Sequence, residues 1–418
     1  MKFTIDGQHP LSGEIEVNGA KNAALKFMAA SLLSKEPWTL KNVPEIQDVK
    51  MMLELLKELG VEIIHDQPHV YTLNAKDVKT SALPEEMSAK LRASILCVGP
   101  LLARFGEAIF SYPGGCILGK RPIDLFLDSY QALGAEYHEH NNKFTVKAKK
   151  GLSGNKFIFP WISHTVTESL ILTAALSQGK TTIINAAMEP EVESLCQWLN
   201  SLGAKISNGG HHTVVIEGVD SIGGGETEII PDRIETGTFA VLGSLASESL
   251  VIRKCQPKHL EVFWELLKRA GGEVKVTDDI VVVKRAKTLK ALELRTREYP
   301  GFATDLQAPF TVLLTQAKGL SLVHEVIYEG RLFYTDTLNK MGAKIIMADP
   351  HRVVIEGPTP LVGKKMESPD IRAGIALVIA AIIAQGTSVI ENASQIDRGY
   401  EKIDDRLKSL GAKIHRDD

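Results

Sequence analysis

The chain has 418 residues, 44% of them hydrophobic and 24% charged, which is long enough for two or three domains that each bury a core. A formal net charge of −3 predicts no general attraction to nucleic acid or to an anionic membrane. The N-terminal MKFTIDGQHP lacks the apolar core of a signal peptide, and the longest apolar run, residues 375–384, is shorter than the roughly 20 residues of a bilayer span. The cysteines form no CxxC pair, which predicts neither a disulfide framework nor a zinc site and favours a reducing cytoplasm; they are Cys97, Cys116, Cys196 and Cys255.

Six short phrases of related sequence recur along the chain: LGVEI, LGAEY, LGAKI, AGGEV, MGAKI and LGAKI. Intervals of 74, 69, 68, 71 and 69 residues separate their first glycines, which are Gly60, Gly134, Gly203, Gly271, Gly342 and Gly411. Self-similarity at a nearly fixed period indicates structural repeats. We therefore predict six repeats of about 70 residues each.

Each phrase follows an amphipathic helix and precedes a strand. Apolar residues at helical spacing predict such helices over residues 49–60, 192–203, 262–271 and 400–411, and each final glycine is expected to form a left-handed C-cap. A second, uniformly apolar helix lies upstream in each repeat, over residues 22–33, 91–103, 167–177, 236–246, 307–317 and 372–384. Because helices that are apolar on all sides belong inside a domain, each repeat should contain one buried helix, one covering helix and several strands. The predicted fold class is therefore α/β.

Polar residues gather at two equivalent places in the repeats. One set lies at the start of the buried helices: Lys21, Asn22, Arg92, residues 163–167, Arg233, Glu235, Asp305, Asp370 and Arg372. The other set precedes the covering helices: Cys116, Arg121, Glu189, Lys258, Arg331, Asp397 and Arg398. Equivalent loops of a repeated fold can converge, and helix N-termini favour anions. Several arginines, a lysine and a carboxylate together predict a pocket for a small substrate that carries phosphate and carboxylate groups.

Other interpretations fit single members of these sets. An isolated arginine is more often a solvated surface residue than a ligand contact, and Asp305 or Asp370 alone would be read as a helix N-cap. Cys116 alone would most often be inert. The sequence contains neither a Walker A loop nor a GxGxxG motif, so we expect no nucleotide triphosphate or dinucleotide cofactor. His211 and His212 have no acidic or cysteine neighbour that would indicate a metal site.

Five motifs, NGAKNAALKFMAASLL, PGGCILGKRPIDL, IPDRIETGTF, FATDLQAPF and IDRGYEKIDDRLKSLGAKI, together resemble the UDP-N-acetylglucosamine 1-carboxyvinyltransferase family of enolpyruvyl transferases. The resemblance covers essentially the whole chain, and the related enolpyruvylshikimate-phosphate synthases lack the cysteine loop. It implies a two-domain inside-out α/β barrel with three repeats in each domain. Residues 1–20 and 230–418 would form the C-terminal catalytic domain, and residues 21–229 would form the N-terminal domain with the Cys116 loop.

The resemblance also implies a reaction. The family transfers the enolpyruvyl group of phosphoenolpyruvate to the 3′-hydroxyl of UDP-N-acetylglucosamine and releases phosphate, the first committed step of peptidoglycan precursor synthesis. The transfer proceeds by addition and elimination through a tetrahedral intermediate, without a cofactor or metal. These implications predict a cytoplasmic enzyme with small-molecule substrates, no nucleic-acid or membrane partner, and sensitivity to fosfomycin.

Family roles carry over to positions in this sequence. The resemblance makes Cys116 the proton donor, on a mobile loop where Lys120 and Arg121 favour the thiolate, and makes Asp305 the acceptor of the sugar hydroxyl's proton. Lys21 and Arg398 complete the catalytic set. The implied phosphoenolpyruvate contacts are Lys21, Asn22, Arg121, Arg331, Arg372 and Arg398. The implied nucleotide-sugar contacts are Arg92, Arg121, Pro122, Ile123, Asp124, Leu125, Trp161, Ile162, Ser163, His164, Asp305 and Ile327.

One segment departs from the family pattern. The family usually has a Ser-Val-Gly turn near the diphosphate, whereas this chain reads PWISHTVTES, with Ser163 retained and the glycine absent. Glycine lets the backbone approach a phosphate closely, so its loss leaves open a paralogous enolpyruvyl transferase with another nucleotide or sugar acceptor. A catalytically silent regulator that binds nucleotide sugar would be expected to have lost Cys116, Asp305 or the arginines, and all are present.

Overall fold

The computed structural model describes residues 1–114 and 122–417. The chain divides into two compact units, which are described separately. The terminal unit contains residues 1–18 and 231–417, and the central unit contains residues 19–114 and 122–230. Cys116, Lys120 and Arg121 therefore lie outside the described residues.

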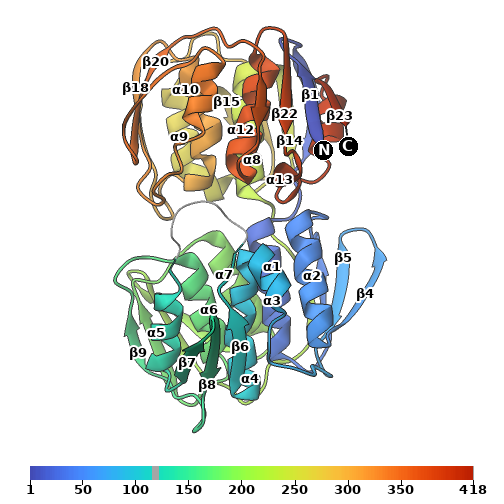
Figure 1. Cartoon of the computed structure of the whole chain (residues 1–418), viewed down its shortest axis with the longest axis vertical. Helices are drawn as coiled ribbons and strands as arrows, with labels where there is room; N and C mark the ends of the chain where they lie inside the picture. The colour runs from blue at the N-terminus through green and yellow to red at the C-terminus, as the bar shows by residue number, and fades with distance from the viewer. Residues whose placement is uncertain (115–121, 418) are drawn as a thin grey trace. The chain divides into compact units, whose positions relative to one another are not determined.

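The terminal unit contains three four-stranded sheets within its described residues. In spatial order the first is β21 (Lys365–Glu367), β22 (Thr387–Glu391), β1 (Lys2–Asp6) and β23 (Lys413–Asp417). The second is β15 (Glu273–Val276), β16 (Val281–Lys284), β14 (Ser247–Arg253) and β2 (Leu11–Glu16). The third is β17 (Glu293–Arg295), β18 (Gly319–His324), β20 (Arg352–Gly357) and β19 (Lys344–Asp349). The first strands of the chain thus complete sheets built mainly from its second half, and both chain ends meet where β1 pairs with β23 (Figure 1).

The central unit repeats this plan over its described residues. One sheet is β13 (Gly225–Glu228), β3 (Trp38–Lys41), β5 (Val70–Asn74) and β4 (Glu62–Gln67). Another is β11 (Lys205–Gly210), β12 (Thr213–Glu217), β10 (Lys180–Ile184) and β9 (Lys156–Ile158). The third has β6 (Glu107–Ser111), β8 (Lys143–Lys147) and β7 (Glu136–His140), with a parallel bridge from Ala82 to Ile109 at its edge. Each four-stranded sheet has one parallel pair at an edge and is otherwise antiparallel, so the sheets share one topology.

The apolar helices lie inside each unit, among the sheets (Figure 1). In the central unit they are α1 (Lys21–Ala30), η2 (Arg92–Cys97) running into α4 (Val98–Phe105), and α6 (His164–Ala174). In the terminal unit they are α8 (Arg233–Ala246), α10 (Gln307–Thr315) and α12 (Ile371–Ile383). Every residue of α12 from Arg372 to Ile382 is buried, as expected for a helix that is apolar on all sides.

The covering helices have one buried face. They are α2 (Gln47–Leu59), α5 (Asp124–Ala132), α7 (Pro190–Ser201), α9 (Glu261–Arg269), α11 (Thr335–Lys340) and α14 (Ile403–Ser409). The repeat glycine after each adopts a left-handed conformation, with φ of 101°, 94°, 103°, 93°, 106° and 103° for Gly60, Gly134, Gly203, Gly271, Gly342 and Gly411. The predicted glycine caps and the α/β class are therefore confirmed. Short helical turns complete the set: η1 (Ser31–Leu33), α3 (Glu85–Lys90), η3 (Pro257–Leu260), η4 (Thr304–Leu306) and α13 (Ser394–Asp397).

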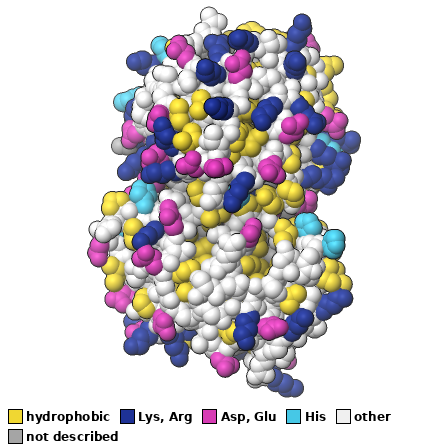
Figure 2. Space-filling model, turned by 180° about the vertical axis from the view of Figure 1, so that it is seen from behind, with side chains coloured by type: hydrophobic (Ala, Val, Ile, Leu, Met, Phe, Trp, Pro, Cys, Tyr) yellow, Lys and Arg dark blue, Asp and Glu magenta, His cyan; other side chains and the backbone are white. Residues whose placement is uncertain are grey.

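The surface carries both signs of charge. Figure 2 shows Lys and Arg side chains interspersed with Asp and Glu side chains on the visible face of each unit. Within the described residues, no helix is long and apolar enough to cross a membrane.

Candidate functional site

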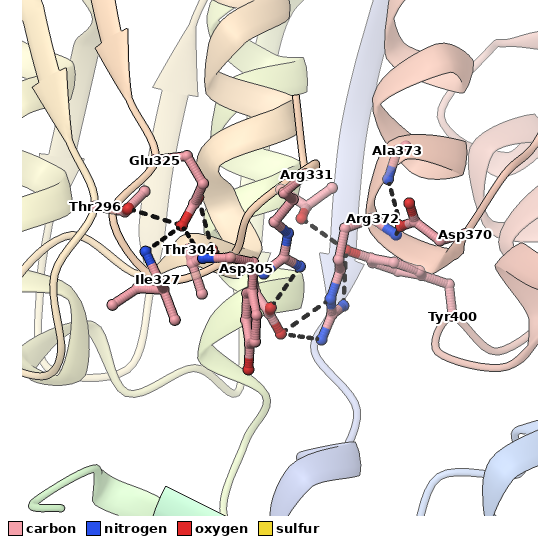
Figure 3. A network of polar contacts seen from close by, with 12 residues as sticks. Thr296, Thr304, Asp305, Glu325, Ile327, Arg331, Asp370, Arg372, Ala373 and Tyr400 are labelled. Atoms are coloured by element: carbon pink, nitrogen blue, oxygen red, sulfur yellow. Dashed lines mark hydrogen bonds and ion pairs between the residues drawn. The ribbon is translucent and has the colours of Figure 1, made fainter. Parts of the chain in front are cut away.

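The terminal unit brings three of the predicted site residues together. Arg331 Nη2 donates to Asp305 Oδ1 at 2.8 Å, while Arg372 Nη2 and Nε donate to Asp305 Oδ2 at 2.8 and 3.1 Å. Figure 3 shows the carboxylate of Asp305 pointing between the two guanidinium groups. Asp305 lies in η4 before inner helix α10, Arg372 lies in the first turn of inner helix α12, and Arg331 precedes covering helix α11. Equivalent loops of different repeats therefore converge, as the sequence predicts.

Burial and charge oppose each other at Asp305. The side chains of Arg331 and Arg372 are 4% and 7% exposed and that of Asp305 is 24% exposed. Burial alone would raise the pKa of Asp305, but the positive charges of Arg372 and Arg331 outweigh it and hold the pKa well below its usual range. Burial likewise disfavours both charged guanidinium groups, whereas the Asp305 charge raises their pKa values. The cluster is therefore fully ionised at neutral pH.

The two N-cap interpretations have different outcomes. The Asp370 carboxylate accepts hydrogen bonds from the backbone N–H groups of Arg372 and Ala373 at 2.8 and 3.0 Å, so it caps α12. The N-cap interpretation of Asp305 is wrong. Ala303 and Leu306 occupy the N-cap positions of η4 and α10, and neither helix has a side-chain cap. Two arginines from other loops bind the Asp305 carboxylate more strongly than backbone N–H groups would.

Each arginine has a support of its own. Arg372 Nη1 donates to the Tyr400 hydroxyl at 3.3 Å and lies 5.6 Å from the centroid of the Tyr400 ring. The Tyr400 hydroxyl in turn lies 2.9 Å from Thr238 Oγ1 on α8. Arg331 Nη1 donates to Thr304 Oγ1 at 2.8 Å. These contacts hold the Nη1 atom of each guanidinium group, which does not bind Asp305.

A second charged pair lies in the central unit. Lys21, in the first turn of α1, places its Nζ 2.6 Å from Asp48 Oδ2 in the first turn of α2, and both side chains are buried. Asn22 follows on α1 and is half-buried. In this repeat the inner helix supplies the cation and the covering helix supplies the carboxylate. In the pair of Asp305 and Arg331 the charges are reversed, because the carboxylate precedes the inner helix and the arginine precedes the covering helix.

The other predicted residues of the central unit lie apart from this pair in the sequence. Arg92 begins η2, and its Nη1 donates to the carbonyl of Pro113 at 3.1 Å. Beyond the undescribed residues, Pro122 is exposed and Asp124 begins α5, whereas Ile123 and Leu125 are buried in the hydrophobic core. Because the side chains of Ile123 and Leu125 lie in the core, only the backbone of these two residues can contact a ligand.

The segment that departs from the family pattern begins inner helix α6. Ser163 is the N-cap, and its Oγ accepts from the N–H of Val166 at 3.4 Å. His164 Nε2 lies 3.2 Å from Thr165 Oγ1. Trp161 is 57% exposed, and Ile162 is half-buried. Side chains therefore occupy a turn where a glycine would leave the backbone open.

Other members of the predicted sets have separate partners. Arg398 Nη1 donates to Gln395 Oε1 at 3.2 Å. Asp397 accepts from Arg416 at 2.8 and 3.0 Å. The N–H of Ile327 donates to Glu325 Oε1 at 2.8 Å, next to the Asp305 cluster (Figure 3). Among the described residues, no group of three or more His, Cys, Asp and Glu side chains has the arrangement of a metal site.

Comparison with known proteins defines the family. Residues 5–407 match the family described as EPSP synthase (3-phosphoshikimate 1-carboxyvinyltransferase). The UDP-N-acetylglucosamine 1-carboxyvinyltransferase of Helicobacter pylori (strain HPAG1) is 41% identical over 414 residues, which cover 99% of this chain and 98% of the relative. The protein of the same name from Koribacter versatilis (strain Ellin345) is 41% identical over 418 residues, covering 99% and 96%. The chain belongs to the UDP-N-acetylglucosamine 1-carboxyvinyltransferase family.

Solved structures agree with this placement at the level of the fold. The enolpyruvyl transferase NikO from Streptomyces tendae aligns with a TM-score of 0.90 at 24% identity and covers 99% of this chain and 98% of that chain. EPSP synthase from Acinetobacter baumannii aligns with a TM-score of 0.76 at 16% identity and full coverage of both chains. The predicted enolpyruvyl transferase fold is therefore confirmed.

For this UDP-N-acetylglucosamine 1-carboxyvinyltransferase family member, sequence reasoning missed several residues around the site. Asp48, Thr304, Glu325 and Tyr400 contact predicted site residues but were not predicted themselves. Asp48 stands in the first turn of a covering helix, and Glu325 directly follows strand β18, which ends in LSLVH. An acidic residue at such a boundary is a usable signal, but it also fits a solvent-exposed loop.

Proposed function

We propose that the chain transfers the enolpyruvyl group of phosphoenolpyruvate to the 3′-hydroxyl of UDP-N-acetylglucosamine and releases phosphate. The observation that carries the proposal is Asp305 held between Arg331 and Arg372 in a chain 41% identical over its length to enzymes of that name. Two arginines and one carboxylate provide both anion binding and a proton acceptor. Arg331 Nε is buried and has no hydrogen-bond partner among the described residues, so a substrate anion would supply one.

The roles that the resemblance assigns to the predicted site residues account for the addition step. The sugar 3′-oxygen forms a bond to C2 of phosphoenolpyruvate, Asp305 takes the hydroxyl proton, and Cys116 gives a proton to C3. Lys21, Asn22, Arg121 and Arg398 hold the phosphate, while Arg331 and Arg372 hold the carboxylate. In the elimination, the C2–O bond to phosphate breaks, the Cys116 thiolate takes a proton back from C3, and the proton held by Asp305 passes to the departing phosphate. This leaves the carboxyvinyl ether and restores both residues.

The two arginines that bind Asp305 affect how well it can act as the base in this reaction. A carboxylate with a pKa well below its usual range is ionised but weakly basic. The carboxylate of phosphoenolpyruvate competes for the same guanidinium groups. As these groups turn to the substrate, Asp305 loses positive charge, its pKa rises, and it becomes a stronger base. Binding of phosphoenolpyruvate would therefore activate the base.

The wider roles follow from the product. A carboxyvinyl UDP-N-acetylglucosamine is a precursor of peptidoglycan, so we assign the chain to cell-wall synthesis, and thereby to cell shape and division, in the cytoplasm. We also assign residues 1–20 with 230–418 to the catalytic domain and residues 21–229 to the domain with the Cys116 loop. The division into units after residues 18 and 230 supports this assignment.

Release of phosphate from phosphoenolpyruvate, with and without UDP-N-acetylglucosamine, tests the proposal. Acceptor-dependent release with a carboxyvinyl product is expected. Cys116→Ser should abolish most turnover, because a hydroxyl is a much weaker acid, whereas Cys116→Asp should retain measurable turnover. Absence of release with UDP-N-acetylglucosamine would overturn the proposal.

A second candidate is an enolpyruvyl transferase that uses another nucleotide or sugar acceptor. The side chains of His164 and Thr165 at the start of α6 favour it, because they fill the turn expected near the diphosphate. A panel of nucleotide sugars in the same phosphate assay separates the two. Turnover with another acceptor and none with UDP-N-acetylglucosamine would establish the second candidate, and no turnover with any acceptor would favour a silent regulator.

A further inference from the structure

The carboxylate of Glu325 lies completely buried beside the Asp305 cluster and is bound by four donors. Thr296 Oγ1 donates to Oε1 at 3.0 Å, and Thr304 Oγ1 donates to Oε2 at 2.7 Å. The backbone N–H groups of Ile327 and Tyr328 donate to Oε1 at 2.8 and 3.2 Å. A buried carboxylate costs several kcal/mol unless such donors satisfy it. Figure 3 shows Glu325 at one end of the network that continues to Asp305 and Arg372.

Thr304 connects Glu325 to Arg331. A threonine hydroxyl has a single proton, and the carboxylate of Glu325 can only accept, so the proton of Thr304 points to Glu325. The oxygen of Thr304 is then left to accept from Arg331 Nη1, which lies 2.8 Å away. Arg331 therefore donates to Thr304, and Thr304 donates to Glu325, so the direction of both hydrogen bonds is fixed. Charge at one end of such a chain strengthens the neighbouring bonds.

The same carboxylate fixes a backbone segment. Glu325 follows β18, and its bonds to the N–H groups two and three residues later close a tight turn before Arg331. Ile327, a predicted nucleotide-sugar contact, lies within that turn. One buried group thus sets both the guanidinium position of Arg331 and the backbone position of Ile327.

We propose that Glu325 and Thr304 are positioning residues that hold Arg331 for the carboxylate of phosphoenolpyruvate and Ile327 for the nucleotide sugar. The proposal rests on the proposed function, and it adds two residues that touch neither substrate. Thr304 acts through Arg331 alone, whereas Glu325 acts on both Arg331 and Ile327. The two residues should therefore affect the two substrates differently.

Three threonine variants separate positioning from a general structural role. Thr304→Val removes the acceptor of Arg331 and should raise KM for phosphoenolpyruvate about tenfold, the effect of one hydrogen bond to a charged group. The KM for UDP-N-acetylglucosamine should change by less than about twofold. Thr304→Ser keeps the hydroxyl and should restore the wild-type KM. Thr296→Val removes another donor to Glu325 but leaves the bond from Thr304 to Arg331, so its KM for phosphoenolpyruvate should stay within about twofold of wild type.

Two results would contradict the role of Thr304. Equal increases in KM for Thr304→Val and Thr296→Val, or no rescue by Thr304→Ser, would overturn the positioning role of Thr304. Thermal unfolding of all three variants shows whether a change in KM is caused by loss of fold.

Glu325→Gln tests the carboxylate without reference to turnover. Amide hydrogen exchange at residues 327 and 328 should accelerate in this variant, because a neutral amide oxygen accepts more weakly than a carboxylate. Unchanged exchange would overturn the role of Glu325 even in an active enzyme. A wild-type chain without acceptor-dependent phosphate release would instead overturn the proposed function, whatever the exchange shows, so the two failures are distinguishable.

Discussion

Two acidic side chains, one in each unit, show how the surroundings decide the charge of the same chemical group. Asp305 in the terminal unit receives three hydrogen bonds from two guanidinium groups, and its pKa lies well below its usual range. Glu168 in the central unit is completely buried on inner helix α6, and Lys26 Nζ on α1 lies 3.0 Å from its Oε1. Burial raises the pKa of Glu168 to about 8 despite the charge of Lys26.

The difference lies in the number and type of neighbouring charges. Asp305 has two cations around it, and each guanidinium presents several donors in a fixed plane. Glu168 has one lysine, and the negative charges of Glu189 and Glu191 raise its pKa further. Desolvation is the largest effect in both cases, but only the paired guanidinium groups overcome it. Glu168 is therefore mostly protonated at pH 7 although Lys26 lies beside it.

The opposite shifts give opposite dependences of stability on pH. The folded state of Asp305 binds its proton less tightly than the unfolded chain, so its stabilisation is complete above pH 3.8 and is lost as pH falls towards the lowered pKa. The folded state of Glu168 binds its proton more tightly, so stability falls as pH rises from 4.5 to about 8.

The largest expected effect comes from removing the charge of the first carboxylate. Asp305→Asn should lower kcat about 10²–10⁴-fold, because the variant has no base for the sugar hydroxyl. Steady-state phosphate release measures this effect. Glu168→Gln is the matched control, since it removes a buried carboxyl group outside the proposed reaction. Loss of turnover in Glu168→Gln but not in Asp305→Asn would show that Asp305 is not the base and that Glu168 is needed for the reaction.

Removal of the second carboxylate should act on stability. Glu168→Gln should abolish the decline in unfolding free energy between pH 4.5 and about 8, a decline of roughly 4–5 kcal/mol at most. Denaturant unfolding at pH 5, 7 and 8.5 measures the difference. If wild type and variant show parallel pH dependences, Glu168 is ionised across this range and the comparison fails.

Removal of the lysine should sharpen the contrast by a smaller amount. Lys26→Met leaves Glu168 without a cation, so the pKa of Glu168 should rise further and the unfolding free energy at pH 7 should fall by about 1–3 kcal/mol. Lys90→Met is the control, because the Lys90 to Glu86 pair lies on the surface with side chains 62% and 81% exposed. That variant should change stability by less than about 1 kcal/mol. Equal losses in the two variants would show that the burial of Lys26 is irrelevant.

The cysteine thiols extend the comparison of buried ionisable groups. The expected change is the smallest of the four, the addition of one fosfomycin molecule to one cysteine. Burial raises the pKa of Cys97 and Cys196 to about 12 and that of Cys255 to about 11, so these thiols should stay unreactive at pH 7.5. Fosfomycin should therefore modify Cys116 alone, as mass spectrometry of intact and digested protein would show. An adduct on another cysteine with Cys116 unmodified would remove the thiol from the proposed mechanism.

Local sequence patterns determined the architecture of this protein. The spacing of the glycines indicated the repeats, the apolar runs identified the inner helices, and apolar residues at helical spacing identified the covering helices. The helices depend on neighbours within a few residues along the chain, and the repeats are visible as recurring phrases, so periodicity and backbone preference are sufficient to predict both. The two loop sets were also predictable, because each stands at a fixed place in the repeat. The cap formed by Asp370 is local as well, and it was one of the two interpretations that the sequence left open for this residue.

Only the tertiary structure decided what the charged residues do. Asp305 fits the pattern of an N-cap, but arginines 26 and 67 residues away in the sequence bind it instead. Lys26 and Glu168 lie within apolar helices whose patterns give no sign that they meet across the core of the central unit. The same is true of Glu325 and Thr304, which are 21 residues apart. Pairing over such distances depends on how the repeats pack, and burial then sets each pKa through the number of opposite charges within reach. The sequence by itself therefore determined the repeats and the loops that carry the charged groups, and packing determined which groups pair, which are charged and where they point.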